Sequence, residues 1–252
     1  MIHSHILKMK VHATTYEAAA EQILAWAKDH QQSRTVFAAN VHMVMEAYDD
    51  ASFRKVVNQA DLVTPDGMPL VWILRWLGHP IKDRVYGPTL MLRVLEAAAR
   101  KGIPVGFYGG APKVLDSLVK NLQSRFQDLN VVFSFSPPFF GPTLEADLGA
   151  VQNINDSGAR ILFLGLGCPK QELWMAAHRD RVKAVMLGVG AAFDFHAGKV
   201  RQAPKWLQKS GLEWLFRLLA EPGRLWKRYL KHNPRFAMLG IMELARKKGN
   251  CI

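Results

Sequence analysis

One aspartate lies between an apolar run and a helical pattern, where a carboxylate could act as a base. Asp66 occupies the turn of ADLVTPDGMPLVW. A carboxylate there can point into a cleft and take a proton from an incoming hydroxyl. A lone aspartate at such a boundary is more commonly a helix cap or a turn residue. A catalytic role for Asp66 therefore requires other polar groups beside it.

Two further polar residues at element boundaries could accompany Asp66. Asn40 follows the apolar run TVFAAN, and its amide could bind a sugar hydroxyl or orient the carboxylate. Arg84, in DRVYGPTL, could neutralise a diphosphate leaving group. Each could instead be a cap or a surface ion pair. Asp66, Arg84 and Asn40 are the candidate catalytic residues.

Glycine-rich turns follow several other apolar runs and could approach a phosphate closely. They are GFYGG, GLGCP and GVGAAFDFHAG, and none is the GxGxxG dinucleotide fingerprint. Each could be no more than a compact turn, and the residues after GLGCP could be an ordinary first helical turn or could contact phosphate, ribose or uracil. With the glycine after Asp66, the candidate binding residues are Gly67, Gly109, Gly110, Gly165, Gly167, Lys170, Gln171, Glu172, Gly190 and Asp194.

The sequence predicts neither a metal site nor a cofactor. HExxH, CxxC, a His-rich tract and Asp-x-Asp are all missing from it. A sugar-nucleotide site would then have to stabilise the leaving diphosphate with cationic side chains and helix N-termini. The two cysteines, Cys168 and Cys251, have no pair spacing, which favours a reducing compartment over a disulfide framework.

These candidates fall where apolar runs alternate with helical patterns. Strands are predicted at 34–39, 61–64, 103–108, 130–135, 160–165 and 183–189, and helices at, for example, 15–30, 68–77, 88–101 and 112–126. This alternation predicts an α/β fold with a doubly wound, mainly parallel, Rossmann-like sheet. Ligands bind such sheets at the carboxyl ends of the strands. The segment 134–143, rich in proline and phenylalanine, is expected to be a loop near that site.

The C-terminal fifth of the chain differs in composition from the rest. The formal net charge is +12, and 13 basic against three acidic residues lie from Lys199 onward. Such an asymmetry indicates an anionic partner, which could be membrane lipid, phosphate or nucleic acid. We predict two parts, a catalytic α/β domain over residues 1–198 and a basic C-terminal appendage over residues 199–252.

The appendage has the pattern of helices that lie on a membrane. Apolar residues of GLEWLFRLLA share one helical face, EPGR then breaks the helix, and LWKRYLK interleaves aromatic residues with cations. Basic helices with such a face bind membrane interfaces. The alternative is a terminal helix packed on the domain with solvated lysines. No secretory signal or run of about 18 apolar residues is present, so the protein is expected to be soluble or to lie on a surface.

Several segments together resemble one family. TPDGMPLVW, DRVYGPTL, GFYGG, LGLGCPKQE and VGAAFDFHAGKVRQAP occur in the order and spacing of the WecG/TagA/CpsF glycosyltransferases. The resemblance covers nearly the whole chain, from about Ala38 to Tyr229, and its DGMP and PKQE segments are specific. The tail GLEWLFRLLAEPGRLWKRYL is also similar to that of the family.

The resemblance implies an inverting transferase that uses a UDP-sugar donor and a polyprenyl-diphosphate-linked saccharide acceptor. It also implies a cytoplasmic, peripheral protein on the inner face of the cell membrane. It makes Asp66 the proposed general base and matches Arg84 to a family arginine. It also implies that the tail closes over the site and supplies the arginines Arg217, Arg224 and Arg228. Exopolysaccharide, capsule or teichoic-acid-type synthesis is the expected context, and homo-oligomer formation stays open.

The chain departs from the family pattern at two places near the expected site. Ala38-Ala39-Asn40 stands where the family commonly has T-x-N, so no contact of a threonine hydroxyl carries over. DRVYGP replaces a frequent V-T-G version. The donor stays open among glucose, N-acetylmannosamine and its uronic acid, with YGP a weak hint toward glucose.

Two other classes of function remain as alternatives. Glycine turns after strands could hold a dinucleotide in an oxidoreductase, although GxGxxG and a hydride-transfer set are missing. A non-enzymatic protein that binds membrane or nucleic acid would explain the basic tail, but it would leave PDG, GLGCPKQE and FDFHAG without a role. The sequence therefore favours a glycosyltransferase that binds no nucleic acid.

Overall fold

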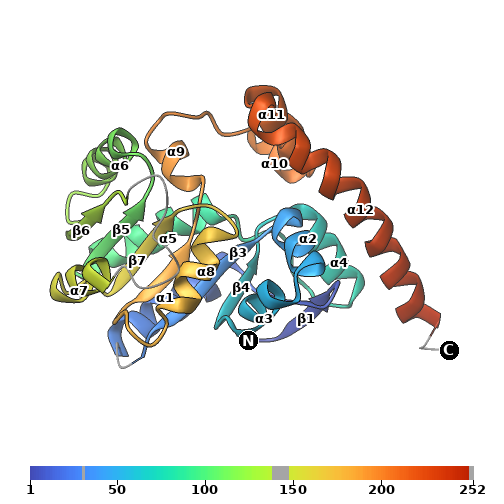
Figure 1. Cartoon of the computed structure of the whole chain (residues 1–252), viewed down its shortest axis with the longest axis horizontal. Coiled ribbons are helices and arrows are strands. Elements are labelled where there is room, and N and C mark those ends of the chain that lie inside the picture. The colour runs from blue at the N-terminus through green and yellow to red at the C-terminus, as the bar shows by residue number, and fades with distance from the viewer. Residues whose placement is uncertain (30–31, 138–147, 250–252) are drawn as a thin grey trace.

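A six-stranded parallel sheet forms the centre of the molecule (Figure 1). The computed structural model describes residues 1–29, 32–137 and 148–249. In chain order the strands are β3 (Arg34–Ala39), β4 (Leu62–Pro65), β5 (Val105–Gly109), β6 (Val131–Phe135), β7 (Ile161–Gly165) and β8 (Val185–Gly188). They are arranged β4-β3-β8-β7-β5-β6, and every pairing is parallel. All six predicted strands are confirmed, each within two residues at either end.

Helices cover both faces of this sheet, which confirms the predicted doubly wound α/β class. One face carries α1 (Tyr16–Asp29), α5 (Gly87–Arg100), α6 (Pro112–Arg125) and α9 (Ala192–His196). The other carries α2 (Val41–Asp49), α3 (Ala51–Gln59), α4 (Met68–Trp76), α7 (Leu148–Asp156) and α8 (Lys170–Ala177). The four helices predicted from the sequence agree with α1, α4, α5 and α6.

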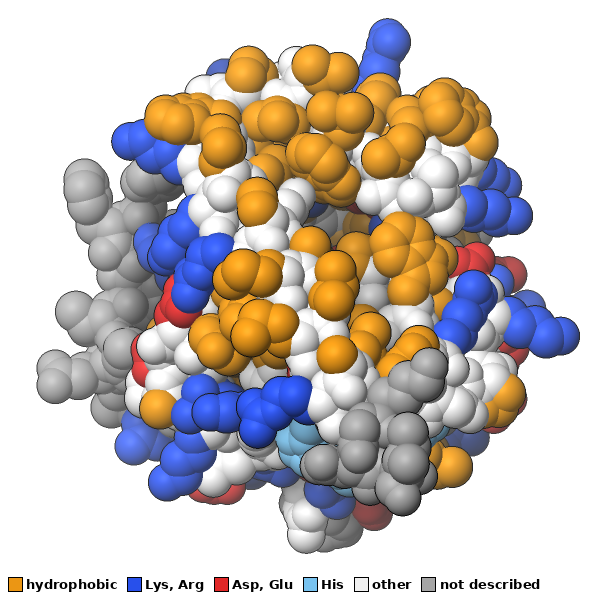
Figure 2. All heavy atoms as spheres, turned by 90° about the vertical axis from the view of Figure 1, so that its right-hand side faces the viewer, with side chains coloured by type: hydrophobic (Ala, Val, Ile, Leu, Met, Phe, Trp, Pro, Cys, Tyr) orange, Lys and Arg blue, Asp and Glu red, His pale blue; other side chains and the backbone are white. Residues whose placement is uncertain are grey.

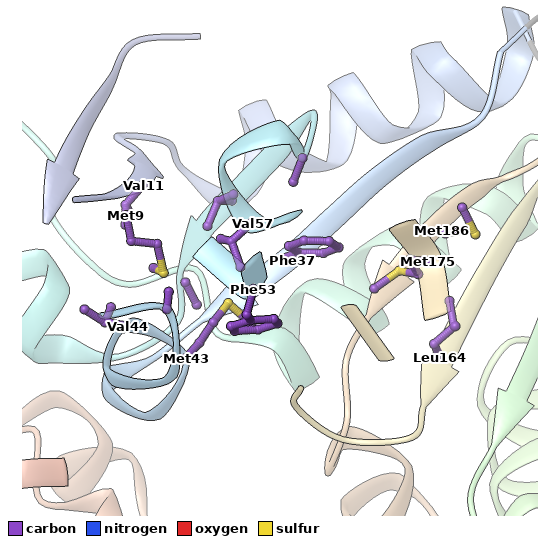
Figure 3. Packing of buried hydrophobic residues seen from close by; sticks show 14 of the residues in the cluster. Met9, Val11, Phe37, Met43, Val44, Phe53, Val57, Leu164, Met175 and Met186 are labelled. Carbon is purple, nitrogen blue, oxygen red and sulfur yellow. The ribbon is translucent and has the colours of Figure 1, made fainter. Parts of the chain in front are cut away.

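The central strands are buried on both sides because their apolar side chains alternate between two cores. Phe163 packs beneath α5 and α6, whereas its neighbour Leu164 packs beneath α8. Figure 3 shows the second core, where Phe37, Leu164 and Met186 of the strands meet residues of α2, α3 and α8. Continuous apolar runs of this kind are typical of parallel strands, which explains why the sequence predicts them well.

A two-stranded hairpin precedes the sheet and was not predicted. Its strands, β1 (His3–Ile6) and β2 (Met9–His12), are antiparallel. His12 Nδ1 accepts the backbone N–H of Val63 at 2.9 Å, and burial lowers the pKa of His12 to about 4, so the ring stays neutral. The hairpin thereby covers an N–H of edge strand β4, a group that would otherwise be open to another strand.

The C-terminal part forms three helices, α10 (Lys205–Lys209), α11 (Glu213–Ala220) and α12 (Pro222–Gly249). The predicted break at EPGR is confirmed between α11 and α12. Helix α12 runs along the right-hand side of Figure 1 and packs against α2. It is also tied to the hairpin, because Leu7 N–H donates to Glu243 Oε2 at 2.7 Å. Within the described residues, no helix has the length and apolar content needed to cross a bilayer.

Candidate active site

The turn after β4 fixes the backbone of Asp66. The N–H groups of Asp66 and Gly67 both donate to Ala39 O, at 2.8 and 3.3 Å. This ties the end of β4 to the end of β3. Gly67 then caps α4, in which a proline occupies the first turn, so the helix begins directly after the carboxylate. Asp66 thus lies at the carboxyl edge of the sheet, as predicted.

The carboxylate of Asp66 is held by one hydrogen bond in a largely apolar setting. Gly87 N–H donates to Asp66 Oδ1 at 2.6 Å, which leaves Oδ2 as the oxygen that can face a substrate hydroxyl. Burial raises the pKa of Asp66 to about 6, with Glu213 adding to the rise while Arg84, the Gly87 N–H and Arg217 oppose it. A carboxylate with such a pKa is ionised at neutral pH and is a stronger base than an exposed aspartate.

Arg84 lies beside Asp66, but its charge is already balanced. Arg84 Nη2 lies 2.6 Å from Glu213 Oε2 and 2.8 Å from Gln208 Oε1, and both side chains of the ion pair are buried. Nη1 donates to the backbone oxygen of Asp66 at 3.4 Å. Both partner side chains come from the C-terminal part of the chain. Arg84 therefore joins the appendage to the turn that carries the carboxylate.

Tyr86 contacts both members of the buried Arg84–Glu213 ion pair. Its hydroxyl donates to Glu213 Oε1 at 2.9 Å, and its ring lies 4.1 Å from the Arg84 guanidinium. Burial and the neighbouring Glu213 raise the pKa of the Tyr86 phenol well above its usual value, so it stays a donor. The sequence analysis missed Glu213, Gln208 and Tyr86 as site residues. The unusual tyrosine of DRVYGP was the available signal.

A cavity of about 570 Å³ opens between Asp66 and the appendage. Its walls are mostly apolar side chains of α4 and α12, including Trp72, Trp76 and Phe236. Its polar lining includes Asn40, Asp66, Arg84, Glu213, Arg217 and Arg228. A ligand in this cavity would contact a carboxylate and cations, and elsewhere it would contact the mostly apolar walls formed by α4 and α12.

Two appendage arginines, Arg217 and Arg228, line this cavity, and neither forms an ion pair with an acidic side chain of the described residues. Their Nε–H groups are buried and donate to no acceptor among those residues. Their guanidinium groups lie 5.5 Å from the ring of Phe195 and 5.0 Å from that of Tyr229. Unsatisfied donors on buried cations are costly unless a ligand binds them. The two side chains therefore suit an anionic ligand.

The other appendage arginine and Asn40 are differently placed. Arg224 is exposed, pairs with Glu221 at 2.6 Å and does not line the cavity. Asn40 caps α2, with Oδ1 accepting from Met43 N–H at 3.2 Å, and also lines the cavity. Its amide nitrogen takes no part in this cap, so the capping role and a ligand role are compatible.

The glycine turns form a continuous strip at the same edge of the sheet, beginning next to Asp66. A Cβ on Gly87 would lie 4.0 Å from Val189 O, and one on Gly190 would lie 3.9 Å from Gly167 Cα. Gly109 (φ +116°) and Gly165 pack so closely that a Cβ on Gly109 would come within 2.8 Å of the Gly165 backbone. Glycine is required at that contact. The strip lies outside the cavity lining.

The predicted binding residues of α8 and α9 are largely engaged within the protein. Gln171 and Glu172 are buried and bonded to each other at 2.7 Å, and burial raises the pKa of Glu172 to about 7. Lys170 is exposed, and Asp194 Oδ1 lies 3.2 Å from Lys199 Nζ. Gly110 O accepts from Ser136 Oγ at 2.6 Å, at the start of the predicted loop, of which residues 138–143 lie outside the described residues.

The face around the cavity is unusually apolar. Figure 2 shows hydrophobic side chains over its upper half and centre, with Lys and Arg toward the margins. Many large apolar side chains of α4 and of the appendage are exposed: Trp72, Trp76, Trp206, Leu212, Trp214, Leu215, Leu219, Trp226, Leu230, Met238, Ile241 and Met242. We call this set the apolar face. Exposed patches of this size mark interaction surfaces.

The chain was also compared with known protein families. The model of the family described as "Glycosyl transferase WecG/TagA/CpsF family" matches residues 4–250. The match runs from the hairpin through the sheet to α12, so it includes both Asp66 and the appendage.

Proposed function

The chain belongs to the WecG/TagA/CpsF glycosyltransferase family, and on that premise we propose that it moves a sugar from a UDP-sugar to a polyprenyl-diphosphate-linked saccharide. We place this reaction at the inner face of a bacterial membrane, in the synthesis of a cell-surface polysaccharide. The observation that carries the proposal is the carboxylate of Asp66, which lines a mostly apolar cavity together with cations, while the other carboxylate of that lining, Glu213, is paired with Arg84.

Asp66 is the proposed general base. Oδ1 is fixed by the Gly87 N–H, and Oδ2 takes the proton of an acceptor hydroxyl as that hydroxyl attacks the anomeric carbon. The bond between the sugar and UDP breaks on the opposite side, which inverts the anomeric centre. General-base assistance is worth about 10²–10⁴ in rate.

Arg217 and Arg228 are the proposed cations for the diphosphates. Arg84 was the first candidate from the sequence, but its charge is matched by Glu213. The appendage arginines have buried donors without a protein partner, so they can stabilise negative charge without breaking an ion pair. We assign Arg84 a positioning role, because it links Glu213 and Gln208 of the appendage to the backbone of Asp66. The predicted contacts of Arg224 remain a hypothesis.

The two substrates would occupy different parts of the site. The glycine strip beside Gly87 can take the nucleotide of the donor, since close-packed glycines at strand ends let a diphosphate approach the backbone. The cavity between α4 and α12 can take the first isoprene units of the acceptor, because its walls are apolar. The apolar face would then lie on the membrane that holds the rest of the lipid.

The direct test is a transfer assay. The protein is incubated with vesicles that contain a short polyprenyl-diphosphate saccharide and with each of UDP-glucose, UDP-N-acetylmannosamine and the uronic acid of the latter. We expect one donor to give UDP release and a lipid product one sugar larger. Binding of NADH in place of UDP, or salt-sensitive DNA binding without UDP binding, would contradict the proposal.

Substitution of the base gives the sharpest test of the chemistry. We expect Asp66→Asn to lower turnover by about 10²–10⁴ while UDP binding is retained, because the amide cannot take a proton. Asp116→Asn is the matched control, since Asp116 is exposed on α6. Full turnover by Asp66→Asn would exclude Asp66 as the base.

The pH dependence of the reaction reports the same group. Asp66 acts in its ionised form, and its pKa is about 6, so kcat/KM should fall about tenfold for each pH unit below that value. The wild-type profile should show this acid limb, and the residual activity of Asp66→Asn should lack it. An identical limb in both proteins would assign it to another residue.

A further inference from the structure

Three potential metal ligands from two distant parts of the chain meet beside the cavity. His42 and Glu46 lie one turn apart on α2, and His232 lies opposite them on α12. Glu46 Oε1 is 3.2 Å from His232 Nε2 and 3.7 Å from His42 Nδ1. One ligand atom from each residue can be chosen so that all three lie within 4.8 Å of one another. This cluster joins the appendage to the α/β domain.

The spacing of these atoms suits one metal ion better than a hydrogen-bond network. Ligand atoms about 2.0–2.1 Å from a tetrahedral Zn²⁺ lie roughly 3.3 Å from each other. The 3.7 Å between His42 Nδ1 and Glu46 Oε1 is too long for a hydrogen bond but is close to such a ligand pair. His42 Nδ1 is in fact buried without a hydrogen-bond partner. A cation between the three side chains would satisfy it.

The chemistry of the three side chains indicates the class of metal ion they would bind. Two imidazoles and one carboxylate form a ligand set that favours Zn²⁺ and related transition metals over Mg²⁺ or Ca²⁺.

The surrounding charges limit the affinity of the three side chains for a metal ion. Arg228, Lys231 and Arg235 are nearby, and Asp49 pairs with the last two. These cations oppose a divalent ion, so we expect weaker binding than in a closed site with four protein ligands. With three protein ligands one coordination position is left, and His42 itself lines the cavity.

We propose that His42, Glu46 and His232 bind one transition-metal ion of the Zn²⁺ class, which fastens α12 to α2 and so holds the appendage over the cavity. The sequence predicted no metal site, because His232 is 186 residues from Glu46 and only the i, i+4 spacing of His42 and Glu46 is visible in it. The site is independent of the donor and acceptor proposed above.

Metal binding can be tested without an activity measurement. The chelator-treated full chain is titrated with Zn²⁺ and, separately, with Mg²⁺, and metal content and thermal unfolding are followed. We expect about one Zn²⁺ per chain, a higher Tm with Zn²⁺ and no change with Mg²⁺. His232→Ala should lose the bound ion and the shift in Tm, and His42→Ala serves the same purpose if His232→Ala does not fold.

The N-terminal histidines provide the matched control. His3 lies 5.7 Å from His5 and 5.5 Å from His12, between ring centres, and could bind Zn²⁺ on its own. His3→Ala should keep the ion and the shift in Tm. If wild type binds no stoichiometric Zn²⁺, or if His3→Ala abolishes binding while His232→Ala keeps it, the proposed site is wrong.

The proposal that the ion fastens α12 to α2 can be tested separately by limited proteolysis. Zn²⁺ should slow proteolysis between Gly198 and Gly211, the connection that leads into the appendage, by at least severalfold in wild type and not in His232→Ala. Binding of Zn²⁺ to the three residues with no such protection would overturn the fastening role.

Discussion

The α/β domain and the appendage are stabilised in different ways. Two extensive apolar cores hold the domain, and nearly all side chains of its central strands are buried. Among the described residues after Lys199, by contrast, the buried hydrophobic side chains are Ala203, Leu225 and Phe236. The appendage is fixed instead by polar contacts, which reach Arg84, Glu46, Asp49 and the Leu7 N–H.

Because of this difference, the Asp66 turn can be rigid while the appendage over the cavity is held less tightly. Apolar cores are stable whatever the state of the site, so the Asp66 turn stays in place. Polar contacts across a partly hydrated interface are individually weaker, and elements held by them open more readily. An element attached in this way can open while the Asp66 turn stays in place.

The buried ion pair should matter most. Glu213→Ala leaves the Arg84 guanidinium buried without its carboxylate, which costs about 3 kcal/mol of the free energy of unfolding, or roughly 6–12 °C in Tm. Because Glu213 contributes to the raised pKa of Asp66, the acid limb of kcat/KM should also move to lower pH. Thermal unfolding and a pH–rate profile measure the two effects.

A second glutamate of the appendage is the control for this variant. Glu221 pairs with Arg224, which is exposed, so Glu221→Ala should change the free energy of unfolding by at most about 1 kcal/mol and leave the acid limb in place. If Glu213→Ala behaved like Glu221→Ala, the buried pair would not be what joins the two regions.

The same contrast explains what the sequence could predict. The strands, and the position of Asp66 at the end of one of them, could be predicted because burial on both faces gives continuous apolar runs, and Asp66 follows such a run directly. Glu213 was not predicted because its partner Arg84 is 129 residues away and a glutamate in the basic C-terminal part resembles a solvated residue. Pairings between distant polar side chains leave no local pattern, so the contacts of the appendage had to come from the structure.

The structure shows which groups lie next to Ala38, where the chain departs from the family pattern. A Cβ on Gly87 would lie 3.2 Å from Ala38 Cβ and 3.8 Å from Asp66 Oδ1. The residue at position 38 therefore borders the Gly87 N–H that donates to Asp66. The sequence showed that a threonine was missing there, but only the folded chain places that position next to Gly87.

The apolar face should give an intermediate effect that is confined to membrane binding. Leu219 is 76% exposed on α11, so Leu219→Ser should weaken binding to anionic vesicles about tenfold, since burying a leucine in an apolar phase is worth about 1.5–3 kcal/mol. The Tm should not change. Vesicle co-sedimentation measures the binding constant.

An exposed apolar residue elsewhere tests whether position matters. Ile2 is 71% exposed just before the N-terminal hairpin and is not a member of the apolar face, and Ile2→Ser should leave vesicle binding unchanged. Equal losses in the two variants would mean that general hydrophobicity, and not the apolar face, drives the interaction.

The smallest effect is expected at the outer ion pair between the two regions. Arg235 donates to both carboxylate oxygens of Asp49, at 2.9 and 2.8 Å, but both side chains are partly exposed. Solvent and salt screen such pairs, so Arg235→Ala should lower the free energy of unfolding by at most about 1 kcal/mol and change turnover less than twofold. Unfolding at low and high salt, combined with the transfer assay, measures this. A loss as large as that of Glu213→Ala would place the main attachment of the appendage on its outer surface, and the cavity would then be closed from outside rather than through Arg84.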